Sequence, residues 1–208
     1  MIREVQYVEM NNQLPGILEV CTGFGNNLAL VSNELNTITN HWQGDRCAAF
    51  MKIWNEKVEA FKFYAYLLET GLPQFLKETV INKYAELDEN LEFVKGAIEI
   101  TQNGQSIQKF ENVDPGGNTV KFEIELMGEE KAKLWDAFEK CYTSLTDIET
   151  KVSALPWNSS ARDDFNGMLA GVLQAAKEAI GQTQKAMITD IENAIEQAEN
   201  AVSNGANA

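Results

Sequence analysis

Few residues of this chain have the type and spacing that catalysis or metal binding requires. His41 is the only histidine among 208 residues, so a Ser-His-Asp or Cys-His site would have to pass through this one side chain, beside a predicted turn. Cys21, Cys47 and Cys141 are odd in number and widely spaced, which excludes a disulfide framework and a Cys-x-x-Cys zinc site. We interpret the cysteines as small core residues, and we expect no catalytic residue, no metal and no cofactor.

Two weaker patterns do not change this prediction. Gly23-Phe24-Gly25 has two glycines of a dinucleotide-binding fingerprint, but it lies inside a helical pattern, follows no strand and lacks the third glycine. Carboxylates are abundant but spread along predicted helix faces, and no pair is set apart for acid–base chemistry. The sequence therefore predicts a protein that is not an enzyme.

The charge balance narrows the classes of partner. The chain has 17 basic and 31 acidic residues, and phosphate binding depends on clustered Lys and Arg, so we expect neither nucleic acid nor an anionic membrane as a partner. Residues 1–10 lack the apolar core of a signal peptide. No stretch approaches the roughly 20 consecutive apolar residues of a membrane span. We expect protein partners, no membrane span and no export by the general secretory route.

Apolar residues at alternating steps of four and three predict a first helix that packs against other helices. This seam consists of Ile17, Cys21, Phe24, Leu28, Val31, Leu35 and Ile38. After Trp42-Gln43-Gly44, Asp45 is the expected N-cap of a second helix, which Gly71 and Pro73 should interrupt before it resumes and ends near Glu89. Residues 1–90 are therefore predicted to form a helical hairpin.

The pattern changes to alternation between about Asn90 and Gly128. Val120, Phe122, Ile124 and Leu126 would share one face of a strand. The turn sequences Asn103-Gly104 and Asp114-Pro115-Gly116-Gly117 would separate strands over 97–101, 106–110 and 119–127. We predict that residues 91–128 form a small antiparallel β-meander.

Helical spacing returns in residues 129–208, which we predict to form a second hairpin. Its first seam consists of Leu134, Phe138, Cys141, Leu145, Ile148, Val152 and Leu155. Trp157 follows, and Ser160 with Asp163 resembles a capping box for a last helix of about forty residues. The apolar stripe of this helix consists of Phe165, Leu169, Val172, Ala176, Ile180, Met187, Ile191, Ile195 and Val202.

The two predicted hairpins have the same plan. The seams superpose with the same spacing, and the interval from Trp42 to Phe50 equals that from Trp157 to Phe165, although the second turn is two residues shorter. One hairpin cannot bury both of its apolar stripes, whereas two hairpins can form a four-helix core. We predict an internal duplication, a mainly α fold in which two antiparallel hairpins form a four-helix bundle, and a monomer with intramolecular pairing.

Trp42-Gln43-Gly44, at a turn between two amphipathic helices near residue forty, resembles the WXG-type, ESAT-like small secreted proteins of type VII secretion. Tyr84-Ala85-Glu86-Leu87-Asp88 is similar to the Tyr-x-x-x-Asp/Glu export signal of that family and stands after the second helix. The resemblance covers residues 1–90. Residues 129–208 keep Trp157 but have Ser159 in place of the glycine and no tyrosine near the end, like a degenerate copy.

The resemblance implies a function and a site. Family members dimerise, and the Trp turn of one hairpin lies beside the export tail of the other. Trp157 would then neighbour Tyr84 and Asp88, whereas Trp42 would face the tail of the second half. The implied recognition residues are Trp42, Gly44, Tyr84, Asp88 and Trp157, in a protein secreted or displayed at the cell surface without a signal peptide. The alternative is a cytoplasmic helical adaptor or structural protein that uses the same bundle without export.

Overall fold

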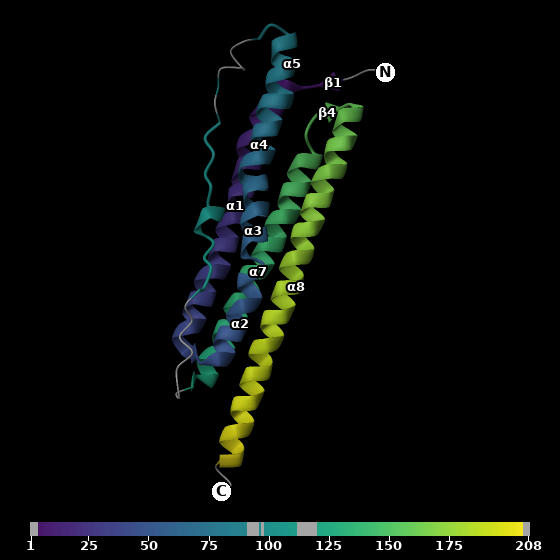
Figure 1. Ribbon diagram of the computed structural model, residues 1–208. Coiled ribbons are helices and arrows are strands. Elements are labelled where there is room, and N and C mark those ends of the chain that lie inside the picture. Colours follow the sequence, from purple (N-terminus) through teal and green to yellow (C-terminus); the bar gives the residue numbers. More distant parts are fainter. Residues whose placement is uncertain (1–3, 91–95, 97, 112–119, 206–208) are drawn as a thin grey trace.

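The computed structural model of the chain describes residues 4–90, 96, 98–111 and 120–205 and is mainly helical (Figure 1), which confirms the predicted class. Within these residues, no helix combines the length and the apolar character needed to cross a bilayer. The helices form two antiparallel pairs, and in Figure 1 the first helices of the two pairs run side by side in opposite directions.

The first hairpin consists of α1 (Tyr7–His41) and a second arm that returns beside it. This arm consists of α2 (Asp45–Asn55), α3 (Val58–Tyr66), η1 (Leu67–Gly71), α4 (Leu72–Gln74), η2 (Phe75–Ile81) and α5 (Asn82–Leu87). The second hairpin consists of α7 (Ile124–Ser153) and α8 (Ser160–Gly205). A 3-10 turn, η3 (Gly104–Ser106), lies in the segment between the hairpins.

Both predicted seams are buried throughout, which confirms the helical periodicity. The structure extends each seam by one heptad towards the N-terminus, because Met10 and Met127 are also buried. In α8, Val202 was expected on the buried stripe but is 65% exposed. Figure 1 shows the reason: the last turns of α8 continue beyond the helices on which it packs.

The predicted interruption at Pro73 is wrong, because the second arm continues through it. Two π-helical segments, η1 and η2, flank the proline, and Gly71 itself keeps a helical φ of −62°. A π turn is wider than an α turn, because each N–H bonds to the carbonyl five residues back instead of four. The wider turn accommodates proline, which has no N–H and whose ring crowds the preceding turn of an α-helix. The arm therefore changes from α-helical to π-helical hydrogen bonding on both sides of Pro73 and remains a continuous helix.

The predicted β-meander is not found in the described residues of the insert. The segment 106–110 has no strand, and the structure has helix from Ile124 onward where a strand was expected over 119–127. Met127 and Leu134 are seven residues apart and both buried, so the helical period wins over the short alternation, while Val120 is 77% exposed. The expected turn at 114–117 and parts of the outer strands lie outside the described residues.

Two short antiparallel strand pairs join the hairpins instead. β1 (Glu4–Val5) pairs with β4 (Trp157–Asn158), and β2 (Trp42–Gln43) pairs with β3 (Lys121–Phe122). Each pair connects the turn of one hairpin to the residues that enter the first helix of the other. The ends of the molecule are therefore closed by contacts between hairpins.

The centre of the molecule shows how the hairpins are related. Asn27 of α1 donates from Nδ2 to Ser144 Oγ of α7 at 2.8 Å, and these residues are 117 positions apart in sequence. The same offset superposes Ile17 on Leu134, so Asn27 and Ser144 are equivalent positions that touch each other. Contact between equivalent positions on antiparallel helices places an approximate two-fold axis at this point.

Candidate functional site

The two tryptophan turns are built alike. Trp42 lies opposite Phe122, and Trp157 lies opposite Val5, the residue equivalent to Phe122. Next to each pair, the N–H of the residue before the first helix donates to the carbonyl before the tryptophan. These bonds, from Glu123 to His41 and from Gln6 to Pro156, are both 3.1 Å long.

Both indole rings are buried in the core rather than presented to solvent. Trp42 is 1% exposed and packs against Phe50, with ring centroids 5.0 Å apart, and edge-on against Phe122 at 5.4 Å. Trp157 is 4% exposed and packs against Phe165 at 5.6 Å. Burial of such large rings stabilises the turn geometry at each end.

The residue that precedes the second helix differs between the two turns, Gly44 in the first and Ser159 in the second. Gly44 has a φ of 114°, a conformation that favours glycine, and precedes α2. Asp45 is the first residue of α2 and not its cap, contrary to the prediction. In the second turn, Ser159 accepts the N–H of Arg162 at 3.3 Å and the indole N–H of Trp157 at 2.8 Å, so Ser159, not Ser160, caps α8.

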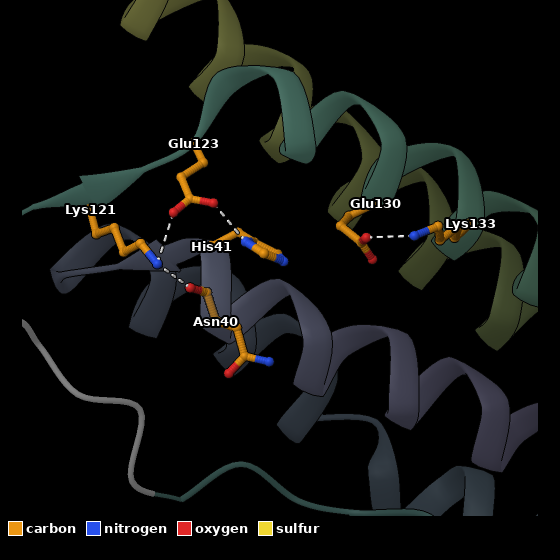
Figure 2. Close-up of polar contacts among 6 residues, drawn as sticks. All are labelled: Asn40, His41, Lys121, Glu123, Glu130 and Lys133. Atoms are coloured by element: carbon orange, nitrogen blue, oxygen red, sulfur yellow. Dashed lines mark hydrogen bonds and ion pairs between the residues drawn. The ribbon is translucent and has the colours of Figure 1, made fainter.

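A cluster of charges fastens the Trp42 turn to the start of α7 (Figure 2). Glu123 accepts Lys121 Nζ at 2.9 Å and lies 2.8 Å from His41 Nδ1, and Lys121 also donates to the carbonyl of Asn40 at 2.7 Å. The hydrogen bonds from Lys121 and then His41 lower the pKa of the Glu123 carboxyl. His41 therefore has a structural hydrogen-bond partner in Glu123, as expected of a polar residue near a helix end.

Glu130, farther along α7 in Figure 2, is buried with one oxygen bonded to Lys133 at 2.7 Å. Its other oxygen has no hydrogen-bond partner among the described residues. An unpaired buried oxygen costs free energy unless a water reaches it. Nothing else about this carboxylate points to a reaction.

The end of α5, which carries the predicted signal residues, lies at the opposite end of the molecule from the Trp42 turn, and the Trp157 turn lies at this end as well (Figure 1). Tyr84 is half-buried against the core, and Asp88 is exposed at the end of α5. Asp88 accepts a hydrogen bond from the Tyr7 hydroxyl at 2.5 Å, and this bond raises the pKa of Tyr7. Tyr7 follows β1, which pairs with Trp157, so β1, β4 and the end of α5 lie at one end of the molecule (Figure 1).

The other end brings the Trp42 turn to the tail of the second hairpin. Arg46, in the first turn of α2, forms an ion pair with Asp190 of α8 at 3.7 Å and bonds to Gln197. The structure thus brings Trp157 to the end of the molecule that holds Asp88, and Trp42 to the tail of α8. Tyr7 and Arg46 were missed by sequence reasoning, because a single tyrosine or arginine near a helix start gives no signal of its distant partner.

The segment 102–110, here called the strap, lies extended along the first hairpin, and its 3-10 turn η3 contacts α1 and α3 (Figure 1). Helix side chains bind its backbone. Ser32 accepts the N–H of Gln108 at 3.1 Å, and the indole of Trp54 donates to the carbonyl of Gln108 at 2.8 Å. Asn55 donates to the Phe110 carbonyl at 2.6 Å and accepts its N–H at 2.8 Å. The strap thereby satisfies these backbone groups without a sheet.

Glu69 is the central polar contact of the strap. It is 2% exposed, and its two oxygens accept the N–H groups of Asn103 at 3.1 Å and Gly104 at 3.0 Å. Burial raises the pKa of this carboxyl, and the two N–H donors act in the opposite direction. Glu69 therefore holds the strap at the point where it turns into η3.

Two glycines let the strap approach this closely. A Cβ atom on Gly25 would lie 1.8 Å from Glu69 Oε1, and one on Gly104 would lie 2.4 Å from the Cβ of Ala65. Gly25, the second glycine of Gly23-Phe24-Gly25, thus allows close packing between α1 and the strap, as its position inside a helix suggests. Glu69 was missed because a charged residue within a helical stripe predicts no particular partner.

The thiols add no nucleophile to this arrangement. Cys21, Cys47 and Cys141 are buried, as predicted, and burial raises the pKa of each to about 12. A thiol with such a pKa is protonated near neutrality and reacts poorly.

Neither a protein-family model, nor a curated protein, nor a solved structure matches the chain.

Proposed function

We propose that this chain is a non-enzymatic interaction protein of type VII secretion, either a substrate or a secretion-associated partner. In this proposal the two hairpins form a four-helix bundle, a single-chain equivalent of a WXG-type dimer. The second hairpin takes the place of the partner subunit, so the protein acts as a monomer. Light scattering that finds only dimers at micromolar concentration would contradict this arrangement.

The observation that carries the proposal is the reciprocal pairing of the two tryptophan turns. Each turn bonds to the entry of the other hairpin through the same backbone contact, at 3.1 Å in both cases. The approximate two-fold axis at Asn27 and Ser144 fits a fused pair of equivalent hairpins. This arrangement supports the composite site, in which Trp157 of one hairpin stands at the end that carries the tail of the other.

The proposed recognition surface is the end of α5 with Tyr84 and Asp88. Asp88 is exposed, so a secretion partner can reach it, although its bond to Tyr7 must be shared or exchanged on binding. Trp42, Gly44 and Trp157 support this surface indirectly by fixing the turns. The alternative, an adaptor that is not exported, uses the same bundle and differs in its destination.

The test is export from a Gram-positive host that has a type VII system, with its secretion ATPase intact or deleted. The wild-type protein should appear in the medium only when the ATPase is present. Asp88→Ala should abolish this export and leave the melting curve unchanged, because surface substitutions change stability by about 0.5 kcal/mol or less. Protein retained in the cytoplasm in both strains would favour the adaptor.

Tyr7→Phe is the matched control, because it removes the same hydrogen bond and keeps the Asp88 carboxylate. Normal export of Tyr7→Phe with loss of export in Asp88→Ala would assign the effect to recognition of the carboxylate. Tyr84→Phe separates the tyrosine hydroxyl from the ring, which packs against the core. Wild-type export of both Asp88→Ala and Tyr84→Phe would exclude the signal.

A further inference from the structure

An apolar groove of about 280 Å³ opens between the second arm of the first hairpin and the first turns of α8. Its lining includes Leu67, Gly71 and Phe75 on one wall and Phe165, Met168 and Val172 on the other. Phe75 and Phe165 stack across it, with ring centroids 5.0 Å apart, and Phe165 also contacts Trp157. The groove is therefore a surface that both hairpins build together.

The described part of the chain leaves this groove uncovered. Met168 on one wall is 65% exposed, and Phe63, four residues before Leu67 on the other wall, is 56% exposed. Gly71 lowers the helix propensity of the arm, and a Cβ atom there would meet only Leu67 Cδ2, at 3.9 Å. The neighbours of Gly71 thus leave room for a side chain at this position, and the groove is deep there because glycine has none.

The shape and charge of the groove identify one kind of occupant. Its walls are two helices, and each contributes about two turns, which matches the apolar stripe of a third helix. We call the residues that follow or precede the lining segments in sequence the lips of the groove; Glu78, three residues after Phe75, and Asp164, directly before Phe165, belong to them. Both side chains are exposed and have no ion pair among the described residues. A second copy of a chain with net charge −14 would bring more negative charge to these lips, whereas Lys and Arg complement them.

We propose that this groove binds an amphipathic helix of a protein partner, with its apolar stripe in the groove and basic residues beside Glu78 and Asp164. The inference does not depend on export, because it concerns a different surface from the end of α5. It predicts that salt weakens binding, because salt screens the attraction between the partner's basic residues and the two carboxylates. It also predicts that a side chain that fills the groove weakens binding, because it takes the place of the partner's apolar residues.

The probe is a fluorescent Leu/Lys peptide with leucines at helical spacing i, i+3, i+4 and i+7, titrated with the full chain. A peptide of the same composition without a leucine stripe is its control. The striped peptide should bind saturably, and the scrambled peptide at least about ten-fold more weakly. Gly71→Leu, which fills the floor, should weaken binding of the striped peptide by about ten-fold or more.

Met168→Gln and Val202→Gln form a matched pair, because both side chains lie on α8 and both are 65% exposed. Only Met168→Gln should weaken binding, and melting curves would show that both variants fold. Equal binding of the two peptides, or unchanged binding by Gly71→Leu and Met168→Gln, would reduce the interaction to charge attraction and overturn the proposal. Absence of binding, or a dimer dispersed by both groove variants, would overturn it as well.

Discussion

The two hairpins fill their outer sides in different ways. At the position of Gly25 in α1, the equivalent residue of α7 is Tyr142, and at the position of Tyr66 in α3, the equivalent residue of α8 is Gly181. Tyr142 donates to the carbonyl of Lys177 at 3.0 Å, and a Cβ atom on Gly181 would lie 2.1 Å from its hydroxyl oxygen. In the second hairpin the Tyr142 ring thus occupies the space beside Gly181. In the first hairpin the strap occupies the space beside Gly25.

This difference shows how a framework of two similar hairpins accepts a third segment. The strap contacts Asn55 and Glu69, and the equivalent positions in α8 are Ala170 and Gln184. The methyl side chain of Ala170 cannot form a hydrogen bond to a neighbouring backbone. Gln184 donates instead to Glu139 of α7 at 2.9 Å. The exchange of Gly and Tyr between the helices, together with two polar side chains, therefore distinguishes a hairpin with a strap from one without.

Gly25→Ala should have the largest effect, because its Cβ would displace the Glu69 carboxylate from a site without spare room. We expect a loss of about 3 kcal/mol in the free energy of unfolding, as for overpacked cores. The control is Gly128→Ala, another helical glycine, whose Cβ would meet nothing within 4 Å. This control should raise stability by about 0.5–1 kcal/mol, so urea unfolding of both variants separates packing from helix propensity.

Glu69→Gln should follow, with a loss of about 2 kcal/mol near neutral pH, because one strap N–H then faces an amide NH2. The native pKa of Glu69 is raised above its ordinary value of 4.5, so the native state holds this proton to higher pH than the unfolded chain. The stabilisation from this shift is present below the unfolded pKa and is lost as pH rises through the native pKa.

The stability difference between wild type and Glu69→Gln should therefore shrink over the pH interval that begins at the unfolded pKa, near the ordinary value of 4.5, and ends at the raised native pKa. Urea unfolding at several pH values measures it. A difference that grows over this interval would mean that the two strap N–H groups outweigh burial and lower the pKa. Native-state hydrogen exchange at Asn103 and Gly104 would locate the change in the strap.

Asn55→Ala makes the first hairpin resemble the second at this position. It removes both bonds to Phe110, and we expect a loss of about 1–2 kcal/mol with faster hydrogen exchange at Phe110. Ala170→Asn is the converse control and should change stability by less than about 0.5 kcal/mol, because Ala170 is exposed. Equal losses in the two variants would show that the strap gains nothing from Asn55.

Gly181→Ala should have the smallest effect. Its Cβ would push against the end of the Tyr142 ring, which is only half-buried and can swing outward, breaking its bond to Lys177. We expect a loss of about 1 kcal/mol, less than for Gly25→Ala, where a buried carboxylate and a backbone must move. Thermal unfolding of the two variants side by side tests the order.

The sequence by itself determined the features that depend on local periodicity and on turn residues. The seams Ile17–Ile38 and Leu134–Leu155, the Trp42 and Trp157 turns, and the equivalence of the hairpins follow from spacing, because a helix places residues three and four apart on one face. The positive φ of Gly44 follows from its place in a turn. The burial of all three cysteines follows from their positions on apolar stripes.

Only the tertiary structure decided where the remaining polar groups find partners. The predicted meander was wrong because residues 119–127 alternate between apolar and polar types and also contain Met127, the first buried residue of the helical seam of α7. Burial along this seam outweighs the local alternation. Pro73 stays within a helix because packing on both sides favours π turns over a break. The bonds of Glu69 to the strap and of Asp88 to Tyr7 join residues 34 and 81 positions apart, and no local pattern encodes such partners, because their geometry depends on how the helices pack.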